Sequence, residues 1–205
     1  MLDHKGFDLW ADGYDRSVGL SDEDGTYPFA GYRAVLNAIY QSVLNASAKS
    51  VLDLGFGTGV LTARLYEQGC TIYGQDFSAR MIELAQAKMP NAVLLQGDFS
   101  HGLSEPLAQQ TYDAIIATYA LHHLTDTQKV ALIQSLRSCL RDGGCLYIGD
   151  VAFESRAALN ACRAQAGDEW DEEEIYFVFD EMKARFPEMR FEPMSFCAGM
   201  LSLRK

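Results

Sequence analysis

The stretch Val51-Leu-Asp-Leu-Gly-Phe-Gly-Thr-Gly59 decides the fold of this chain of 205 residues. Apolar residues flank Asp53, and three glycines follow at alternate positions, which predicts a buried parallel strand that runs into a tight loop. A helix is expected directly behind the loop, over residues 60–68. Glycines let the backbone turn sharply and let a ligand approach the main chain, and the loop meets the positive end of the helix dipole. The stretch therefore indicates a nucleotide-type site on an α/β fold.

The spacing of the glycines distinguishes between nucleotides. A dinucleotide-binding loop has the pattern G-x-G-x-x-G, and the position of its third glycine is occupied here by Val60. A phosphate-binding P-loop needs a lysine after the glycines, and none follows. Asp53, at the carboxyl end of the strand, would repel a pyrophosphate and attract a positively charged ligand. A nucleoside with a cationic tail fits, and S-adenosylmethionine, with its adenosine, sulfonium and ammonium groups, is such a compound.

Three further apolar runs predict neighbouring strands, over residues 70–76, 92–98 and 112–118. The first two end in Asp76 and Asp98, and the third leads into Tyr119. Asp76 lies 76 − 55 = 21 positions after Gly55, close to the roughly 20-residue offset at which an acid bonds the hydroxyls of a ribose. Because the carboxyl ends of parallel strands meet at one edge of a sheet, these residues predict a binding crevice there.

These residues make the chain resemble the class I S-adenosylmethionine-dependent methyltransferases. The resemblance rests on the loop of residues 53–59, on Asp76 and Asp98, and on Tyr119-Ala-Leu-His-His-Leu124. It is nearest to small, uncharacterised bacterial methyltransferases, some of them linked to sulfur and methionine recycling. It implies S-adenosylmethionine as methyl donor and S-adenosylhomocysteine as product. The implied fold is an α/β, Rossmann-like, doubly wound sheet of seven strands, mostly parallel, with an antiparallel carboxyl-terminal strand.

One domain is expected over residues 1–205, because this length suits a single α/β unit. We divide it into an amino-terminal lid (1–32), a donor-binding core (33–150), a helical insert or cap (151–188) and a carboxyl-terminal hairpin (189–205). In the core, Thr125 and Gln128 predict a capping box for a helix that ends near Arg141.

The insert allows two interpretations. A helix is expected over residues 155–166, and Asp171 with Glu174 fits an N-cap and its capping partner for a second helix. Alternatively, some of the acids of this segment, together with Trp170 and Tyr176, wall a pocket for a cationic or amine-bearing substrate.

Composition limits the partners. The formal net charge is 17 − 28 = −11, which argues against nucleic acid, since phosphate binding depends on clustered Lys and Arg. No apolar run approaches the roughly 20 residues of a membrane span, and no signal peptide opens the chain, so we expect a cytoplasmic protein with no membrane partner. The five cysteines include no C-x-x-C pair and are expected to be reduced core residues, with no metal site. The expected partner is a small-molecule methyl acceptor, and the chain is expected to be a monomer or a homodimer.

The resemblance gives each donor-site residue a role. Asp53 is expected to hold the ammonium group, Asp76 the ribose hydroxyls and Asp98 the adenine amino group. The remaining predicted donor-site residues are Gly55, Gly57 and Gly59 in the loop, Phe77, Met81 and Phe99 around the adenine, Thr118 and Tyr119 beside the sulfonium, and Tyr14 in the lid. Ordinary core packing is the alternative role for Phe77, Met81 and Phe99, and Tyr14 could instead be a packed aromatic.

Methyl transfer from a sulfonium is an in-line displacement, in which alignment of donor and acceptor supplies much of the catalysis. A base is needed only if the acceptor starts out protonated. His122 and Tyr119 are the candidate catalytic residues, with His123 a weaker candidate, although a histidine beside a helix start is often structural. The sequence therefore favours a methyltransferase acting on a small molecule. A non-catalytic sensor of S-adenosylmethionine or S-adenosylhomocysteine, or a nicotinamide-dependent oxidoreductase, are the alternatives.

Overall fold

The structure is a computed structural model and describes residues 25–205. Its strands are β1 (Ser50–Leu54), β2 (Thr71–Asp76), β3 (Val93–Gln96), β4 (Tyr112–Thr118), β5 (Leu140–Phe153), β6 (Phe177–Val178), β7 (Arg190–Pro193) and β8 (Ala198–Arg204). Its α-helices are α2 (Tyr32–Asn45), α3 (Val60–Glu67), α4 (Ala79–Lys88), α5 (Glu105–Ala108), α6 (Asp126–Ser138), α7 (Arg156–Ala166) and α8 (Phe179–Arg185). Three short 3₁₀ helices are η1 (Phe99–His101), η2 (Leu121–His123) and η3 (Gly167–Glu169).

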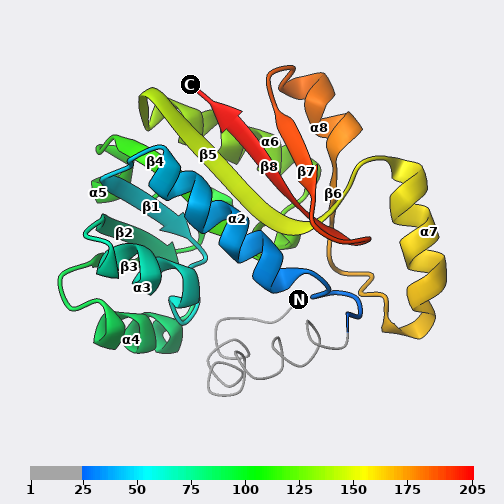
Figure 1. The fold of residues 1–205 in the computed structure, drawn as a ribbon, viewed down its shortest axis with the longest axis horizontal. Coiled ribbons are helices and arrows are strands. Elements are labelled where there is room, and N and C mark those ends of the chain that lie inside the picture. The colour runs from blue at the N-terminus through cyan, green and yellow to red at the C-terminus, as the bar shows by residue number, and fades with distance from the viewer. Residues whose placement is uncertain (1–24) are drawn as a thin grey trace.

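A single sheet runs through the molecule, with helices on both of its faces (Figure 1). The strand order is β3-β2-β1-β4-β5-β8-β7, and β8 runs antiparallel to both of its neighbours, β5 and β7. The predicted Rossmann-like, doubly wound sheet and its antiparallel carboxyl-terminal strand are confirmed. The two-residue strand β6 pairs with the end of β5 and adds an eighth strand to the seven that we expected.

The two faces of the sheet carry separate apolar cores. On one face, Val35, Ile39 and Val43 of α2 pack with residues of α3, α4 and α7. On the other, Leu132 and Leu136 of α6 pack with residues of α5 and α8. Strand β1 is buried along its whole length, as its apolar sequence predicts for a central parallel strand. The core therefore fixes the carboxyl ends of β1, β2 and β4 side by side.

Two local predictions need correction. The capping box of Thr125 and Gln128 is present, but α6 ends at Ser138 rather than near Arg141, because Leu140 already pairs with Tyr112 at the start of β5. Residues 171–176 form no helix, so the predicted N-cap at Asp171 with its partner Glu174 is wrong. The Asp171 carboxylate instead accepts a hydrogen bond from the Glu173 amide, at 2.8 Å, in a local turn. No helix in the described part of the chain is long and apolar enough to cross a membrane.

Candidate active site

The glycine loop connects β1 to α3 and lies against the ends of two neighbouring strands. Gly55 donates its N–H to Gln75 O at 2.8 Å, and a Cβ added to it would lie 2.4 Å from the Cβ of Ala120. Gly57, with a φ of 54°, donates its N–H to Asp76 Oδ2 at 2.8 Å. The loop conformation therefore depends on glycine at both positions, and it places Asp76 directly beside the loop.

Asp53 lies beneath this loop and is only 1% exposed. Its Oδ2 accepts a hydrogen bond from the Thr62 hydroxyl, and its Oδ1 has no hydrogen-bond partner among the described residues. Burial, with a smaller contribution from the charge of Asp76, raises the pKa of Asp53 to about 7. Asp53 and Thr118 both line a small recess under the loop. An unpartnered buried carboxylate oxygen suits a cationic group, so the recess fits the ammonium of an amino acid moiety.

A larger cavity of about 420 Å³ opens on the other side of the loop. Eight of the predicted donor-site residues line it: Gly55, Gly57, Asp76, Phe77, Met81, Asp98, Phe99 and Tyr119. Gly55 and Gly57 also line the small recess, so the two spaces adjoin at the loop. Gly59 lines neither space, because it packs against Met89 and Ala85 of α4. Tyr14 lies outside the described residues. Among the described residues, no Lys or Arg lines either space.

Asp98 follows β3 and caps η1. Its Oδ1 accepts a hydrogen bond from the Ser100 amide at 2.8 Å, and its Oδ2 lies 3.1 Å from Nδ1 of His101. Partial burial alone would raise the pKa of Asp98, but the hydrogen bonds from Ser100 and the proximity of His101 outweigh it, so the pKa lies below its usual value. Asp98 is therefore a carboxylate at neutral pH and can accept a hydrogen bond from a ligand.

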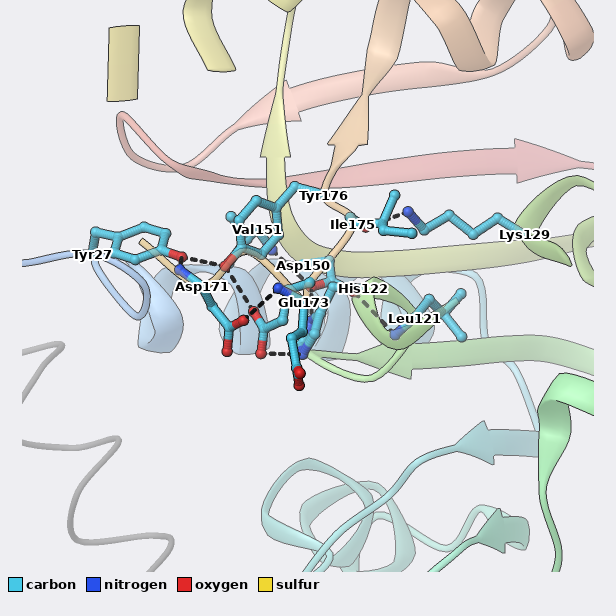
Figure 2. A network of polar contacts seen from close by, with 11 residues as sticks. Tyr27, Leu121, His122, Lys129, Asp150, Val151, Asp171, Glu173, Ile175 and Tyr176 are labelled. Atoms are coloured by element: carbon cyan, nitrogen blue, oxygen red, sulfur yellow. Dashed lines mark hydrogen bonds and ion pairs between the residues drawn. The ribbon is translucent and has the colours of Figure 1, made fainter. Parts of the chain in front are cut away.

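His122, which lines one wall of the larger cavity, forms a buried pair with Asp150 (Figure 2). Nδ1 of His122 lies 2.6 Å from Oδ1 of Asp150. Asp150 is completely buried and lies near the carboxyl end of β5. The backbone N–H groups of Leu121 and Val151 also donate to Asp150, at 3.1 and 2.8 Å. Nε2 of His122 lies 3.5 Å from Oε1 of Glu174. Both edges of the imidazole therefore face carboxylates.

These surroundings give the two adjacent histidines opposite pKa shifts. Burial opposes protonation of His122, but the charges of Asp150 and then Glu174 outweigh it, so its pKa is raised. For His123, burial and the neighbouring His122 lower the pKa to about 4. The ring centroids of His122 and His123 are 4.2 Å apart. His123 is therefore a neutral imidazole at physiological pH and, with His122, lines the larger cavity.

A chain of polar contacts anchors the insert to this wall (Figure 2). Tyr176 donates its hydroxyl to Oε2 of Glu174 at 2.7 Å and is hydrogen-bonded in turn to the hydroxyl of Tyr27. Ile175 donates its N–H to His122 O at 2.8 Å, and its carbonyl accepts a hydrogen bond from the buried ammonium of Lys129. The segment is thus fixed on both sides, and Glu174 is held facing His122.

Sequence reasoning missed part of this wall. Asp150 lies in β5 and, like Asp53 and Asp76, follows an apolar run in the sequence, so this pattern could have identified it. The sequence pattern predicts a capping role for Glu174. Its place beside His122 depends on tertiary contacts with Tyr176 and His122, which local sequence does not reveal. The alternative interpretation, in which acids of the insert wall a pocket, fits the geometry for Asp171, Glu173 and Glu174, which all line the larger cavity. Trp170 and Tyr176, which it also included, are not among the lining residues.

Comparisons with known proteins agree with this geometry. A model of a methyltransferase domain matches residues 51–144. An "Uncharacterized methyltransferase" of Anoxybacillus flavithermus is 41% identical over 160 residues, which cover 78% of this chain and 72% of that protein. One from Geobacillus kaustophilus is 36% identical over 193 residues, covering 90% of this chain and 86% of that protein.

Solved structures show the same fold. The complex of DhpI with S-adenosylhomocysteine superposes with a TM-score of 0.70 at 19% identity, over 98% of this chain and 94% of that one. The magnesium protoporphyrin IX methyltransferase of Synechocystis, with bound S-adenosylhomocysteine, gives a TM-score of 0.66 at 17% identity, over 86% of this chain and 85% of that one. The fold and the relatives define a methyltransferase. The chain belongs to the class I S-adenosylmethionine-dependent methyltransferase family.

Proposed function

We propose that the protein transfers the methyl group of S-adenosylmethionine, in line, to a small molecule held in the larger cavity. One observation carries the proposal: carboxylates at the ends of β1, β2 and β3 surround a glycine loop, with no Lys or Arg among the described lining residues. Such a site suits an adenosyl compound with positive charges and disfavours a diphosphate. Bound S-adenosylmethionine would supply an electrophilic methyl group on its sulfonium.

The donor-site residues divide between the two spaces. Oδ1 of Asp53 would accept a hydrogen bond from the ammonium group, with Thr118 nearby in the same recess. Asp76 would accept hydrogen bonds from the ribose hydroxyls, and Asp98 from the adenine amino group. Phe77, Met81 and Phe99 would enclose the adenine ring, since all three line the larger cavity. Gly55 and Gly57 allow the ligand to lie against the main chain, while Gly59 supports the packing of α3 on α4.

Tyr119 and His122 are the proposed catalytic residues on the acceptor's side of the cavity. Tyr119 has a φ of 48°, which is rare for a residue with a large side chain and often marks a functional constraint. Its N–H donates to Gly149 O at 2.8 Å, and its ring packs on Phe29 and Tyr32. Asp150 is hydrogen-bonded to Nδ1 of His122, so Nε2 is the nitrogen that faces Glu174. Nε2 is therefore the atom that would exchange a proton with the acceptor.

A small acceptor is supported by the size and the enclosure of the cavity. The cavity of about 420 Å³ lies within the usual range for small-molecule sites and must also hold the adenosyl part of the donor, so the remaining space suits only a small acceptor. The insert closes one side of it through Asp171, Glu173 and Glu174. The net charge of −11 opposes a nucleic acid acceptor. One structural neighbour is described as an amino pentose methyltransferase from Micromonospora echinaspora, which acts on a small molecule.

Thermal denaturation with a panel of ligands tests the proposal. A ligand at 100 times its dissociation constant stabilises a protein by about 2.7 kcal/mol. S-adenosylmethionine and S-adenosylhomocysteine should raise the melting temperature, and NADH should not. Stabilisation by NADH alone would overturn the donor assignment. Donor binding without methyl transfer to a broad panel of small acceptors would identify a sensor instead of an enzyme.

A further inference from the structure

We propose that His122, His123 and Glu174 form a binding site for one divalent transition-metal ion on the acceptor's side of the larger cavity. One ligand atom from each of these side chains lies within 4.8 Å of the others. This is the one group of three or more potential ligands that residues 25–205 bring so close together. Sequence spacing does not indicate this site, because Glu174 comes 51 positions after His123 (174 − 123).

The separation of the ligand atoms is close to what a metal requires. Zinc binds imidazole nitrogen at about 2.0–2.1 Å and carboxylate oxygen at about 2.0–2.2 Å, so two such ligands in a tetrahedron are about 3.4 Å apart. Nε2 of His122 and Oε1 of Glu174 lie 3.5 Å apart. The site would then be completed by a rotation of the His123 side chain. Two imidazoles and one carboxylate suit zinc and other first-row divalent ions.

The residues that hydrogen-bond to two of the ligands also support a metal site. A metal-binding histidine usually gives its second ring nitrogen to a carboxylate or a carbonyl, and a metal-binding carboxylate is itself hydrogen-bonded. Asp150 holds Nδ1 of His122 at 2.6 Å, which leaves Nε2 for a metal. Tyr176 holds Oε2 of Glu174 at 2.7 Å, which leaves Oε1. Asp150 and Tyr176 are both buried, so His122 and Glu174 are held in position before any ion binds, and only His123 has to move.

The position of the site gives it a function that rests on the proposed methyl transfer. All three ligands line the larger cavity, so a fourth coordination position would face the acceptor. The ion would act as a Lewis acid and favour the ionised form of a hydroxyl or thiol acceptor, whose proton passes to water. That oxygen or sulfur then forms the bond to the methyl carbon as the carbon–sulfur bond of the donor breaks, and no oxidant is involved. His122 would thus act on the acceptor through the ion.

Calorimetric titration of zinc chloride into the full-length protein, treated with EDTA and then freed of it, tests the site. We expect one zinc ion per chain, and a visible absorption band from a bound cobalt ion in a parallel titration. His123→Ala and Glu174→Gln should each weaken zinc binding about tenfold or more, and Asp150→Asn about 10- to 100-fold. His101→Ala is the matched control, because His101 and Asp98 form an exposed histidine–carboxylate pair 3.1 Å apart. That variant should bind zinc as the wild type does.

The outcomes separate this proposal from the proposed function. Glu174 lies on the acceptor's side, so Glu174→Gln should bind S-adenosylhomocysteine with wild-type affinity, which also shows that the variant is folded. Zinc binding that is absent, or that survives both His123→Ala and Glu174→Gln, overturns the metal site. Full methyl transfer by metal-free protein, for instance to an amine acceptor attracted by the acids of the insert, overturns its role. Failure of the wild type to bind S-adenosylhomocysteine would instead refute the donor assignment and leave the zinc result standing.

Discussion

Thr62 of α3 donates its hydroxyl to Oδ2 of Asp53 of β1, and both side chains are buried. This contact joins the helix to the strand on the two sides of the glycine loop. It also fixes the Asp53 carboxylate so that only Oδ1 lacks a partner among the described residues. The free protein therefore holds a carboxyl group that is costly to ionise until a cationic ligand arrives.

Asp53→Asn should stabilise the ligand-free protein in alkaline solution and weaken donor binding. The folded-state pKa of Asp53 is about 7, above the usual value of 3.8, so the folded protein holds this proton more tightly than the unfolded chain does. Stability from this group is fully present below pH 3.8 and is lost as pH rises to about 7. The variant should therefore melt at a higher temperature than the wild type at pH 8, and this advantage should shrink toward pH 5.

Asp113→Asn is a control in which the substitution should have the opposite effect on stability at pH 8. Asp113 accepts hydrogen bonds from the Lys49 and Ser50 amides, both at 2.9 Å, and pairs with Arg141. Burial alone would raise the pKa of Asp113, but the hydrogen bonds from the two amides and from Arg141, together with the charge of Arg141, outweigh burial and lower the pKa. Its stabilising contribution is present above its usual pKa and is lost as pH falls through the lowered value, so Asp113→Asn should destabilise the protein at pH 8. Equal pH profiles for the two variants would contradict the assignment of Asp53.

Gly55→Ala should disturb the site more than Gly69→Ala, although both glycines have a positive φ, 67° and 85°. A Cβ at position 69 meets no atom within 4 Å, so that variant carries only the cost of a left-handed backbone, about 1–2 kcal/mol. A Cβ at position 55 would lie 2.4 Å from the Cβ of Ala120, between Tyr119 and Leu121. Gly55→Ala should therefore lose additional stability and bind S-adenosylhomocysteine more weakly, as urea denaturation and calorimetry would measure. Equal losses in both variants would exclude a steric role for Gly55.

The sequence predicts the position of the strand ends at this site better than that of the insert, for a physical reason. Asp53, Asp76 and Asp98 follow apolar strands, and parallel strands bring their carboxyl ends together whatever the loops do. The insert has no such constraint. The spacing of Asp171 and Glu174 fits a capping box, but residues 171–176 form no helix, and Ile175 is hydrogen-bonded instead to His122 and Lys129. Those partners come from other elements, so local propensity could not reveal them.

Lys129→Met should release the insert from α6 without disturbing the donor side. The Lys129 ammonium is fully buried, donates to the Ile175 carbonyl and lies 4.7 Å from the ring centroid of Phe177. Methionine keeps the apolar length of the side chain and removes the donor. The Ile175 amide, which donates to His122 O, should exchange its hydrogen faster, whereas the Gly57 amide should keep its protection. Unchanged exchange at Ile175 would mean that other contacts hold the insert.

Asp76→Ala should weaken S-adenosylhomocysteine binding by about 1–3 kcal/mol, the range for a hydrogen bond to a charged group. Its carboxylate also accepts hydrogen bonds from the Gly57 and Ser78 amides, at 2.8 and 2.9 Å, so alanine removes a support of the loop as well as a ligand contact. Asp76→Asn separates the two effects, because its remaining carbonyl oxygen can still accept from the loop while the charge is gone. Glu83 is an exposed residue of α4 that pairs with Arg80, so Glu83→Gln should leave the affinity unchanged.

Calorimetry on these three variants decides the role of Asp76. If Asp76→Ala loses affinity for S-adenosylhomocysteine and Asp76→Asn loses less, two roles are separated. The affinity that Asp76→Asn retains reflects the oxygen that supports the loop, and the affinity that it lacks reflects the charge that binds the ribose. Wild-type affinity in both Asp76 variants would place the ribose elsewhere, because an acid that holds two hydroxyls in a half-enclosed cavity cannot be removed without cost.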